Sequence, residues 1–132
     1  MKCLIVEDEL KSRHFLKEQL SSICECDVAV NGQEAVDSFR LAHELRRPYD
    51  VIFMNITMPV IDGLTALREI RSLEQGMEMP SGLKVKAVMM TAPDDSRTVI
   101  KAFKDGEANS FLVKPITKQK LDKEMATLIL EE

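Results

Sequence analysis

The residues best able to do chemistry stand at the points where short apolar runs of the sequence stop. Four such runs end on an acidic pair, an amide, a hydroxyl and an ammonium group: Glu7, Asp8, Asn55, Thr91 and Lys114. Adjacent carboxylates are hard oxygen ligands suited to magnesium. A lysine can place a charge on a phosphate oxygen, and a threonine hydroxyl can donate a hydrogen bond to another. This set of side chains therefore predicts phosphoryl transfer assisted by a divalent cation.

The nucleophile that this chemistry requires is missing from the set. An aspartate carboxylate can form an aspartyl-phosphate, whereas the amide of Asn55 cannot serve. The sequence also lacks the Gly-rich GxxxxGK[ST] loop, so we do not expect a nucleotide to be held in the P-loop manner. An amide thus stands where the surrounding pattern is typical of a carboxylate.

The elements that must position these side chains are short strands alternating with helices. Five apolar runs are continuous and rich in Val and Ile, as strands buried on both faces are. They are "CLIV" (3–6), "DVAV" (27–30), "VIFM" (51–54), "VKAVMM" (85–90) and "SFLV" (110–113). Five stretches of helical period lie between or after them, with inward faces expected at Leu10, Leu16, Leu20 and Ile23; Ala35, Val36, Phe39 and Leu45; Leu64, Leu67, Ile70 and Leu73; Val99, Ile100 and Phe103; and Leu121, Met125, Leu128 and Ile129.

This alternation predicts an α/β fold, a doubly wound five-stranded parallel sheet with five helices. With the flavodoxin-like strand order 2-1-3-4-5, the polar residues at the strand ends converge on one crevice at the carboxyl edge of the sheet, where ligands of open α/β sheets bind. The stretch "SLEQGMEMPSGLK" (72–84) is predicted to be a long surface loop. We see no repeat or linker, so a single domain over 1–132 is expected.

Composition narrows the classes of partner. The chain carries 18 Lys and Arg against 22 Asp and Glu, a formal charge of -4, so electrostatics favour neither nucleic acid nor an anionic membrane. No apolar stretch approaches the roughly 20 residues that span a bilayer, and a cytoplasmic location is expected. Three cysteines argue against a disulfide framework. Cys24 and Cys26 form a C-x-C without a second ligand cluster, and reduced packing cysteines are predicted.

Four pieces of the sequence together carry a specific family resemblance: "LIVEDE", "VIFMNITMPVIDG", "MMTA" and "FLVKP". Along essentially its whole length the chain resembles a response regulator receiver domain, close to the stand-alone chemotaxis-type receivers. The resemblance implies a flavodoxin-like receiver fold and a signalling module that is not an enzyme. It also implies that the position of Asn55 accepts a phosphoryl group from a histidine kinase or a histidine phosphotransfer protein.

The same resemblance assigns roles to the other residues. Magnesium would be bound by Glu7, Asp8, residue 55 and the main-chain carbonyl of Thr57, and Asn55 would weaken that binding. Thr91 and Lys114 would contact the phosphoryl oxygens, and the Lys114–Pro115 bond would be cis. Phe111 would be the aromatic switch that turns inward as Thr91 moves, although plain core packing explains a Phe at this position equally well. A downstream protein would bind the face formed by the fourth helix, fifth strand and fifth helix, roughly residues 94–130.

Asn55 departs from the family, which has aspartate there, and two explanations compete. One is an otherwise active receiver in which an engineered or natural Asp-to-Asn change blocks phosphorylation. The other is a natural pseudo-receiver, a constitutive interaction module. Retention of the charged cluster favours the first. A small flavodoxin-like enzyme or cofactor binder is disfavoured, because carboxylates stand where a phosphate-cradling turn would be rich in Gly, Ser or Thr.

Overall fold

The structure, a computed structural model, describes residues 1–94, 96–105 and 107–130. Within these ranges, five strands alternate with five α-helices, and a short 3₁₀ helix precedes the fourth strand. The elements are β1 (Lys2–Val6), α1 (Leu10–Leu20), β2 (Glu25–Ala29), α2 (Gly32–Glu44), β3 (Val51–Asn55), α3 (Gly63–Gly76), η1 (Ser81–Leu83), β4 (Lys86–Thr91), α4 (Ser96–Lys104), β5 (Ser110–Val113) and α5 (Lys118–Leu130).

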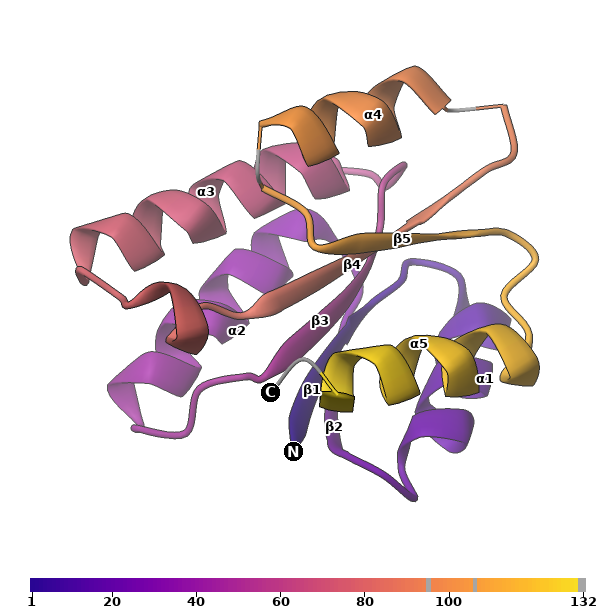
Figure 1. The fold of residues 1–132 in the computed structure, drawn as a ribbon, viewed down its shortest axis with the longest axis horizontal. Helices are drawn as coiled ribbons and strands as arrows, with labels where there is room; N and C mark the ends of the chain where they lie inside the picture. Colours follow the sequence, from indigo (N-terminus) through magenta and orange to yellow (C-terminus); the bar gives the residue numbers. More distant parts are fainter. Residues whose placement is uncertain (95, 106, 131–132) are drawn as a thin grey trace.

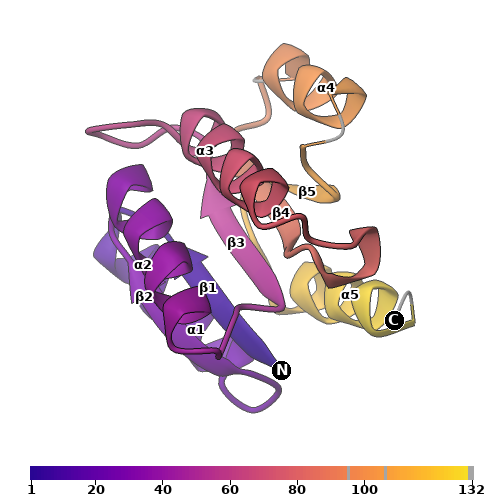
Figure 2. The ribbon, with the colours of Figure 1, turned by 90° about the vertical axis from the view of Figure 1, so that its left-hand side faces the viewer.

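The strands form one parallel sheet in the order β2-β1-β3-β4-β5, which confirms the predicted doubly wound α/β architecture. Helices α2, α3 and α4 lie on one side of the sheet, and α1 and α5 lie on the other (Figure 1). Figure 2 shows the sheet between α3 and α5. Within the described ranges, no helix combines the length and the apolarity needed to cross a membrane.

Two hydrophobic cores lie on the two faces of the sheet, because successive residues of a strand point to opposite faces. In β1, Leu4 and Val6 pack on the side of α2 and α3, whereas Cys3 and Ile5 pack on the side of α1 and α5. The same alternation continues in β3 and β4, whose residues are almost all buried. Because the central strands are buried along almost all of their length, their buried polar side chains are found at the carboxyl ends.

The prediction that all five runs are buried on both faces was wrong for the second and for the fifth, since β5 is the other edge strand and Leu112 is its one buried residue. Strand β2 begins and ends earlier than the predicted run 27–30, and its Val28 is 40% exposed. The reason is its place in the strand order, because β2 is an edge strand with β1 as its one neighbour. The apolar residues of this run match those of a central strand, but no second neighbour covers them.

The predicted surface loop at 72–84 was also wrong in part. Helix α3 continues through the first residues of this stretch to Gly76, and η1 occupies Ser81–Leu83. Leu73 packs against the core and Glu74 is fully buried, so this last turn of α3 has an inward face that stabilises it.

Five residues expected on inward helix faces are exposed instead. Most lie at helix ends, where the chain leaves the sheet, and Ile100 lies beside the buried Val99 on the outer side of α4; the five are Leu10, Ile23, Leu45, Ile100 and Ile129. The side chain of Phe103 lies outside the described residues. The other predicted inward residues are buried or pack against the cores.

The buried carboxylate of Glu74 predicts a large effect on stability. It accepts hydrogen bonds from Arg71 Nη1 at 2.6 Å and from the main-chain nitrogen of Val85 at 2.7 Å. Removing one partner of a buried ion pair leaves the other charge uncompensated, so Glu74→Ala should lower the free energy of unfolding by about 3–5 kcal/mol. Urea unfolding would measure this difference. Glu69→Ala, at an exposed position of the same helix, is the control and should change stability by less than about 0.5 kcal/mol.

Candidate functional site

The acidic pair and Asn55 lie together because β1 and β3 are adjacent. Val6 is the register partner of Met54, so the next residues, Glu7 and Asn55, leave the sheet side by side. Glu7 is only 1% exposed, and Asn55 is also buried. A carboxylate and an amide in such an environment require hydrogen-bonding partners.

The amide nitrogen of Asn55 lies where three oxygen atoms converge. It donates to Asp8 Oδ1 at 3.2 Å, to the main-chain oxygen of Thr57 at 3.1 Å and, more weakly, to Glu7 Oε1 at 3.4 Å. All three acceptors belong to the residues predicted to bind magnesium. The N–H groups of one side chain thus face the oxygens that a cation would require.

Burial dominates the electrostatics of Glu7 and raises the pKa of its carboxyl group above the ordinary value. A hydrogen bond from the main-chain nitrogen of Glu9, at 3.1 Å, and the charge of Lys114 oppose this shift. Lys114 Nζ lies 3.6 Å from Glu7 Oε2, an oxygen that has no hydrogen-bond partner among the described residues. The Glu7 carboxyl group is therefore buried at an energetic cost, and the ion pair with Lys114 is the contact that its Oε2 makes among the described residues.

Thr91 and Lys114 reach the same edge of the sheet from β4 and β5. Thr91 is the register partner of Val113, and the main-chain nitrogen of Lys114 donates to the Thr91 carbonyl at 2.8 Å. The Thr91 hydroxyl is buried and donates to the carbonyl of Ala92 at 3.2 Å. The Lys114–Pro115 bond is cis, as predicted. The five side chains picked out by the sequence therefore stand at the ends of four adjacent strands.

Phe111 lies apart from this crevice. It is 41% exposed, so the alternative that it is a plain core residue was wrong. Together with Thr91, Val99 and Ile100 it borders a largely apolar cavity of about 410 Å³. The cavity lies on the α4 side of β5, next to the threonine.

Two contributors to the site had no recognised signal in the sequence. Arg13, one turn into α1, donates from Nη1 to the Glu7 carbonyl at 3.0 Å. Gly63 begins α3 beside Asn55, and a Cβ atom there would lie 2.2 Å from the Asn55 carbonyl oxygen. Asp62 caps α3 by accepting a hydrogen bond from the main-chain nitrogen of Thr65 at 2.8 Å, but an Asp-Gly pair at a helix start does not reveal a close approach to Asn55. No pattern in the sequence distinguishes Arg13 from the other basic residues of its helix.

The donor atoms fit magnesium by their chemistry. Two carboxylates and a main-chain carbonyl are the hard oxygen ligands that this ion takes, with water filling the remaining positions. In the described part of the chain, no group of three or more His, Cys, Asp or Glu side chains is arranged to hold a metal. The site has two carboxylates, because an amide stands at the third position and already donates to the same oxygens.

Comparisons with known proteins identify the family of the chain. The family model for the response regulator receiver domain matches residues 3–126. The chain is 32% identical over 123 residues to the osmosensing histidine protein kinase SLN1 of Saccharomyces cerevisiae, covering 92% of this chain and 9% of that protein. It is 32% identical over 124 residues to the two-component response regulator ORR41 of Oryza sativa subsp. japonica, covering 92% of this chain and 88% of that protein.

A solved structure of a receiver domain in a complex is also similar to this chain. A chain in the co-crystal structure of the Saccharomyces cerevisiae histidine phosphotransfer signaling protein Ypd1 with the receiver domain of its downstream response regulator Ssk1 is 30% identical, with a TM-score of 0.78. The match covers 94% of this chain and 85% of that chain. This chain spans about a tenth of the length of the histidine kinases among its relatives. The fold, the residues matched and these relatives show that the chain belongs to the response regulator receiver domain family.

Proposed function

We propose that this receiver cannot accept a phosphoryl group on residue 55 and that it acts through protein contacts. The observation that carries the proposal is the position of the Asn55 amide nitrogen, which donates to Glu7, Asp8 and the Thr57 carbonyl. Phosphorylation of a receiver requires a carboxylate oxygen that attacks phosphorus. An amide presents a weakly nucleophilic oxygen and a nitrogen whose lone pair is delocalised, so it provides no equivalent group.

Magnesium fits the same proposal as a weakly held ion. Glu7, Asp8 and the carbonyl of Thr57 would hold it, and when bound it would supply positive charge to phosphoryl oxygens. To admit it, the Asn55 amide must give up its hydrogen bonds to those ligands or turn its oxygen toward the ion. Lys114 and Thr91 are assigned to the phosphoryl oxygens, because they stand at the carboxyl ends of β5 and β4, which follow β3 in the sheet, and the side chain of Lys114 reaches Glu7.

The constitutive interaction module is the second candidate, and one observation favours it. The Asn55 amide donates to one oxygen of Glu7, one oxygen of Asp8 and the Thr57 carbonyl without any cation. A pocket bridged in this way can hold one conformation without phosphorylation. In both candidates the output is a surface, and we assign it to α4, β5 and α5, where Ile100 and Phe111 are exposed beside the apolar cavity.

A phosphotransfer assay tests the proposal against a protein donor. Support for such a donor comes from the matched complex of a receiver domain with a histidine phosphotransfer protein. We expect the chain to bind a histidine-phosphorylated phosphotransfer protein, with Ypd1 as the probe, and to leave its phosphohistidine intact, whereas Asn55→Asp should discharge it. Retention on the immobilised donor measures binding, and loss of label from the donor measures transfer. Discharge by the unchanged chain would contradict the disabled acceptor, and absence of binding by both proteins would contradict this donor class.

A further inference from the structure

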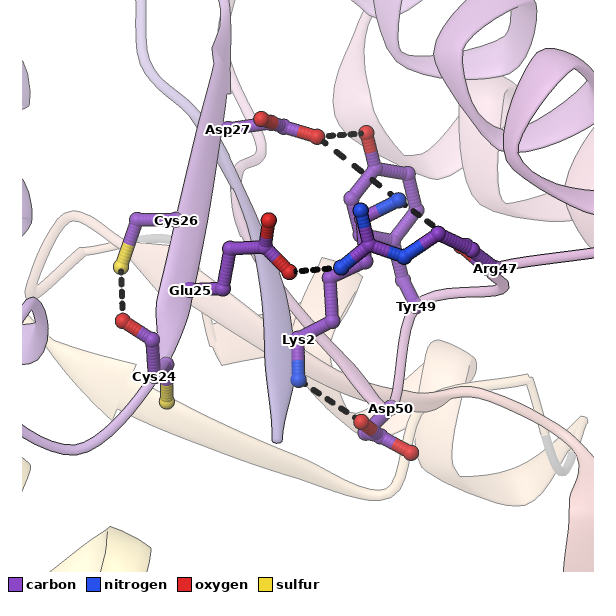
Figure 3. A network of polar contacts seen from close by, with 8 residues as sticks. All are labelled: Lys2, Cys24, Glu25, Cys26, Asp27, Arg47, Tyr49 and Asp50. Atoms are coloured by element: carbon purple, nitrogen blue, oxygen red, sulfur yellow. Dashed lines mark hydrogen bonds and ion pairs between the residues drawn. The ribbon is translucent and has the colours of Figure 1, made fainter. Parts of the chain in front are cut away.

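The chain's three cysteines meet on one face of the sheet, far from the acidic pocket in the strand direction. Cys3 of β1 and Cys26 of β2 are direct register partners, and Cys24 lies two residues before Cys26. Cys3 and Cys24 belong to the core beneath α1 and α5, and Cys26 packs against it. Figure 3 shows Cys24 and Cys26 on the opposite side of β2 from Glu25 and Asp27. All three thiols are free.

The three thiols differ in their access to solvent. Cys3 and Cys24 are buried, whereas Cys26 is partly exposed and lines a cavity of about 420 Å³ that Lys17 and Tyr49 also border. The Cys26 thiol donates to the Cys24 carbonyl at 3.5 Å, which fixes its direction along the strand. A small oxidant therefore reaches Cys26 before the other two.

Polar contacts on the opposite face hold the two strands in this register (Figure 3). The Tyr49 hydroxyl donates to Asp27 Oδ2 at 2.7 Å, and Arg47 forms an ion pair with Glu25. In β1, the main-chain nitrogen of Lys2 donates to Asp50 Oδ2 at 2.7 Å and its ammonium group donates to the Arg47 carbonyl at 2.8 Å. Both strands are thus tied to the segment that precedes β3.

The spacing of the strands suits a disulfide. Register partners on neighbouring strands lie about 4.8 Å apart, within the range of about 4.4–6.8 Å between Cα atoms that disulfides span. Because β2 has β1 as its one neighbour, it can shift slightly to close the bond without disturbing a second strand. The pair Cys3 and Cys26 meets this requirement directly, whereas Cys24 lies diagonally to Cys3.

We propose that Cys26 and Cys3 form a dithiol that peroxide oxidises to a disulfide between β1 and β2. The Cys26 sulfur attacks one peroxide oxygen, the O–O bond breaks, and a sulfenic acid and one water form. The Cys3 sulfur then attacks the Cys26 sulfur, the S–O bond breaks, and a second water leaves with the Cys3 proton. Two thiols are oxidised by two electrons, and one hydrogen peroxide is reduced to two waters.

The environment of the thiols sets the rate and the effect of this reaction. Burial raises the pKa of Cys26, so its reactive thiolate is a minor species at neutral pH and oxidation is slow. The bond would close the chain segment that contains α1. A closed loop restricts the unfolded chain, so the oxidised protein should melt at a higher temperature, and a dithiol reductant should reverse the change.

The test is oxidation of the full chain by millimolar hydrogen peroxide, followed by alkylation of free thiols, digestion and mass spectrometry. Cleavage after Glu25 separates Cys24 from Cys26, so the two possible bridges to Cys3 give different linked peptides. We expect a monomeric product with the Cys3–Cys26 link and a raised melting temperature. Cys26→Ser should abolish the link, and Cys3→Ser should leave a sulfenic acid on Cys26 that dimedone traps.

Cys24→Ser is the matched control, because Cys24 lies on the same face and is also near Cys3. It should still form the Cys3–Cys26 link. The position of the link is the readout and its rate is not, because a hydrogen bond with the Cys24 thiol raises the pKa of Cys3 and the substitution removes that influence. A link through Cys24, a link between two chains, or oxidation of Cys26 to sulfinic acid without a link would each overturn the proposal. Melting curves of the reduced variants show whether each is folded, and dimedone labelling of Cys26 is read only from folded protein.

Discussion

Asn55→Asp is expected to turn a chain that takes up no phosphoryl group into one that is phosphorylated at residue 55. Incubated with magnesium and acetyl phosphate, the unchanged chain should gain no mass, while the variant should gain one phosphoryl group on most molecules. The physical reason is that residue 55 alone combines the end of β3 with contact to both members of the acidic pair. Intact-mass spectrometry, followed by peptide mapping, measures the yield and the position.

The matched control for this change is Asn31→Asp. Asn31 caps α2 by accepting a hydrogen bond from the Glu34 nitrogen at 2.9 Å, and aspartate serves equally well at this position, so the same chemical change is made without disturbing the fold. It should remain unlabelled. Labelling of the unchanged chain would show that the acceptor lies elsewhere. A variant Asn55→Asp that folds, binds magnesium and still takes no label would favour the constitutive interaction module.

The carboxyl edge of the sheet could be predicted because strand ends are visible in the sequence. The runs before Glu7, Asn55, Thr91 and Lys114 are continuous apolar stretches of strand length, and parallel strands bring their ends to a common edge. The expectation of burial on both faces failed for the edge strands β2 and β5, because an apolar run does not show whether a strand has one neighbour or two. Val28 has the same residue type as the buried valines of the central strands and differs from them only in its place in the sheet.

The hydrogen bonds of the Asn55 amide could not be predicted. They depend on where the Thr57 carbonyl points after β3 ends and on how closely Asp8 approaches across the crevice, and both are set by loop geometry. The requirement for glycine at position 63 could not be predicted either. It follows from the short distance to the Asn55 carbonyl, which would clash with a Cβ atom, and not from the turn itself. Residue types predicted the chemistry of the site, and the loop backbone decides which atom faces the carboxylates.

The contacts of Asn55 also predict a difference in stability that magnesium reduces. In chelator, Asn55→Asp should lower the free energy of unfolding by about 3 kcal/mol, because it replaces a donor to three oxygens by a third carboxylate beside the buried Glu7. That difference corresponds to a drop of about 10 °C in the melting temperature of a domain of this size. This difference in the free energy of unfolding between the two proteins should become smaller as the pH falls. Burial already raises the pKa of Glu7, so protons bind the folded state more readily than the unfolded one and relieve the repulsion.

Magnesium should close most of this gap. The variant adds a third carboxylate and has lost the N–H groups that compete for Glu7, Asp8 and the Thr57 carbonyl, so it should bind the ion more tightly than the unchanged chain. An ion at 100 times its dissociation constant stabilises the folded state by about 2.7 kcal/mol, which is close to the predicted penalty. Thermal unfolding of both proteins, in chelator and in millimolar magnesium near neutral pH, measures the stability lost on substitution and the stability that magnesium restores. Asn31→Asp should show neither the loss nor the gain. If the variant is the more stable protein in chelator, or gains no more from magnesium than the unchanged chain does, then the Asn55 amide does not occupy the place of a cation among these oxygens.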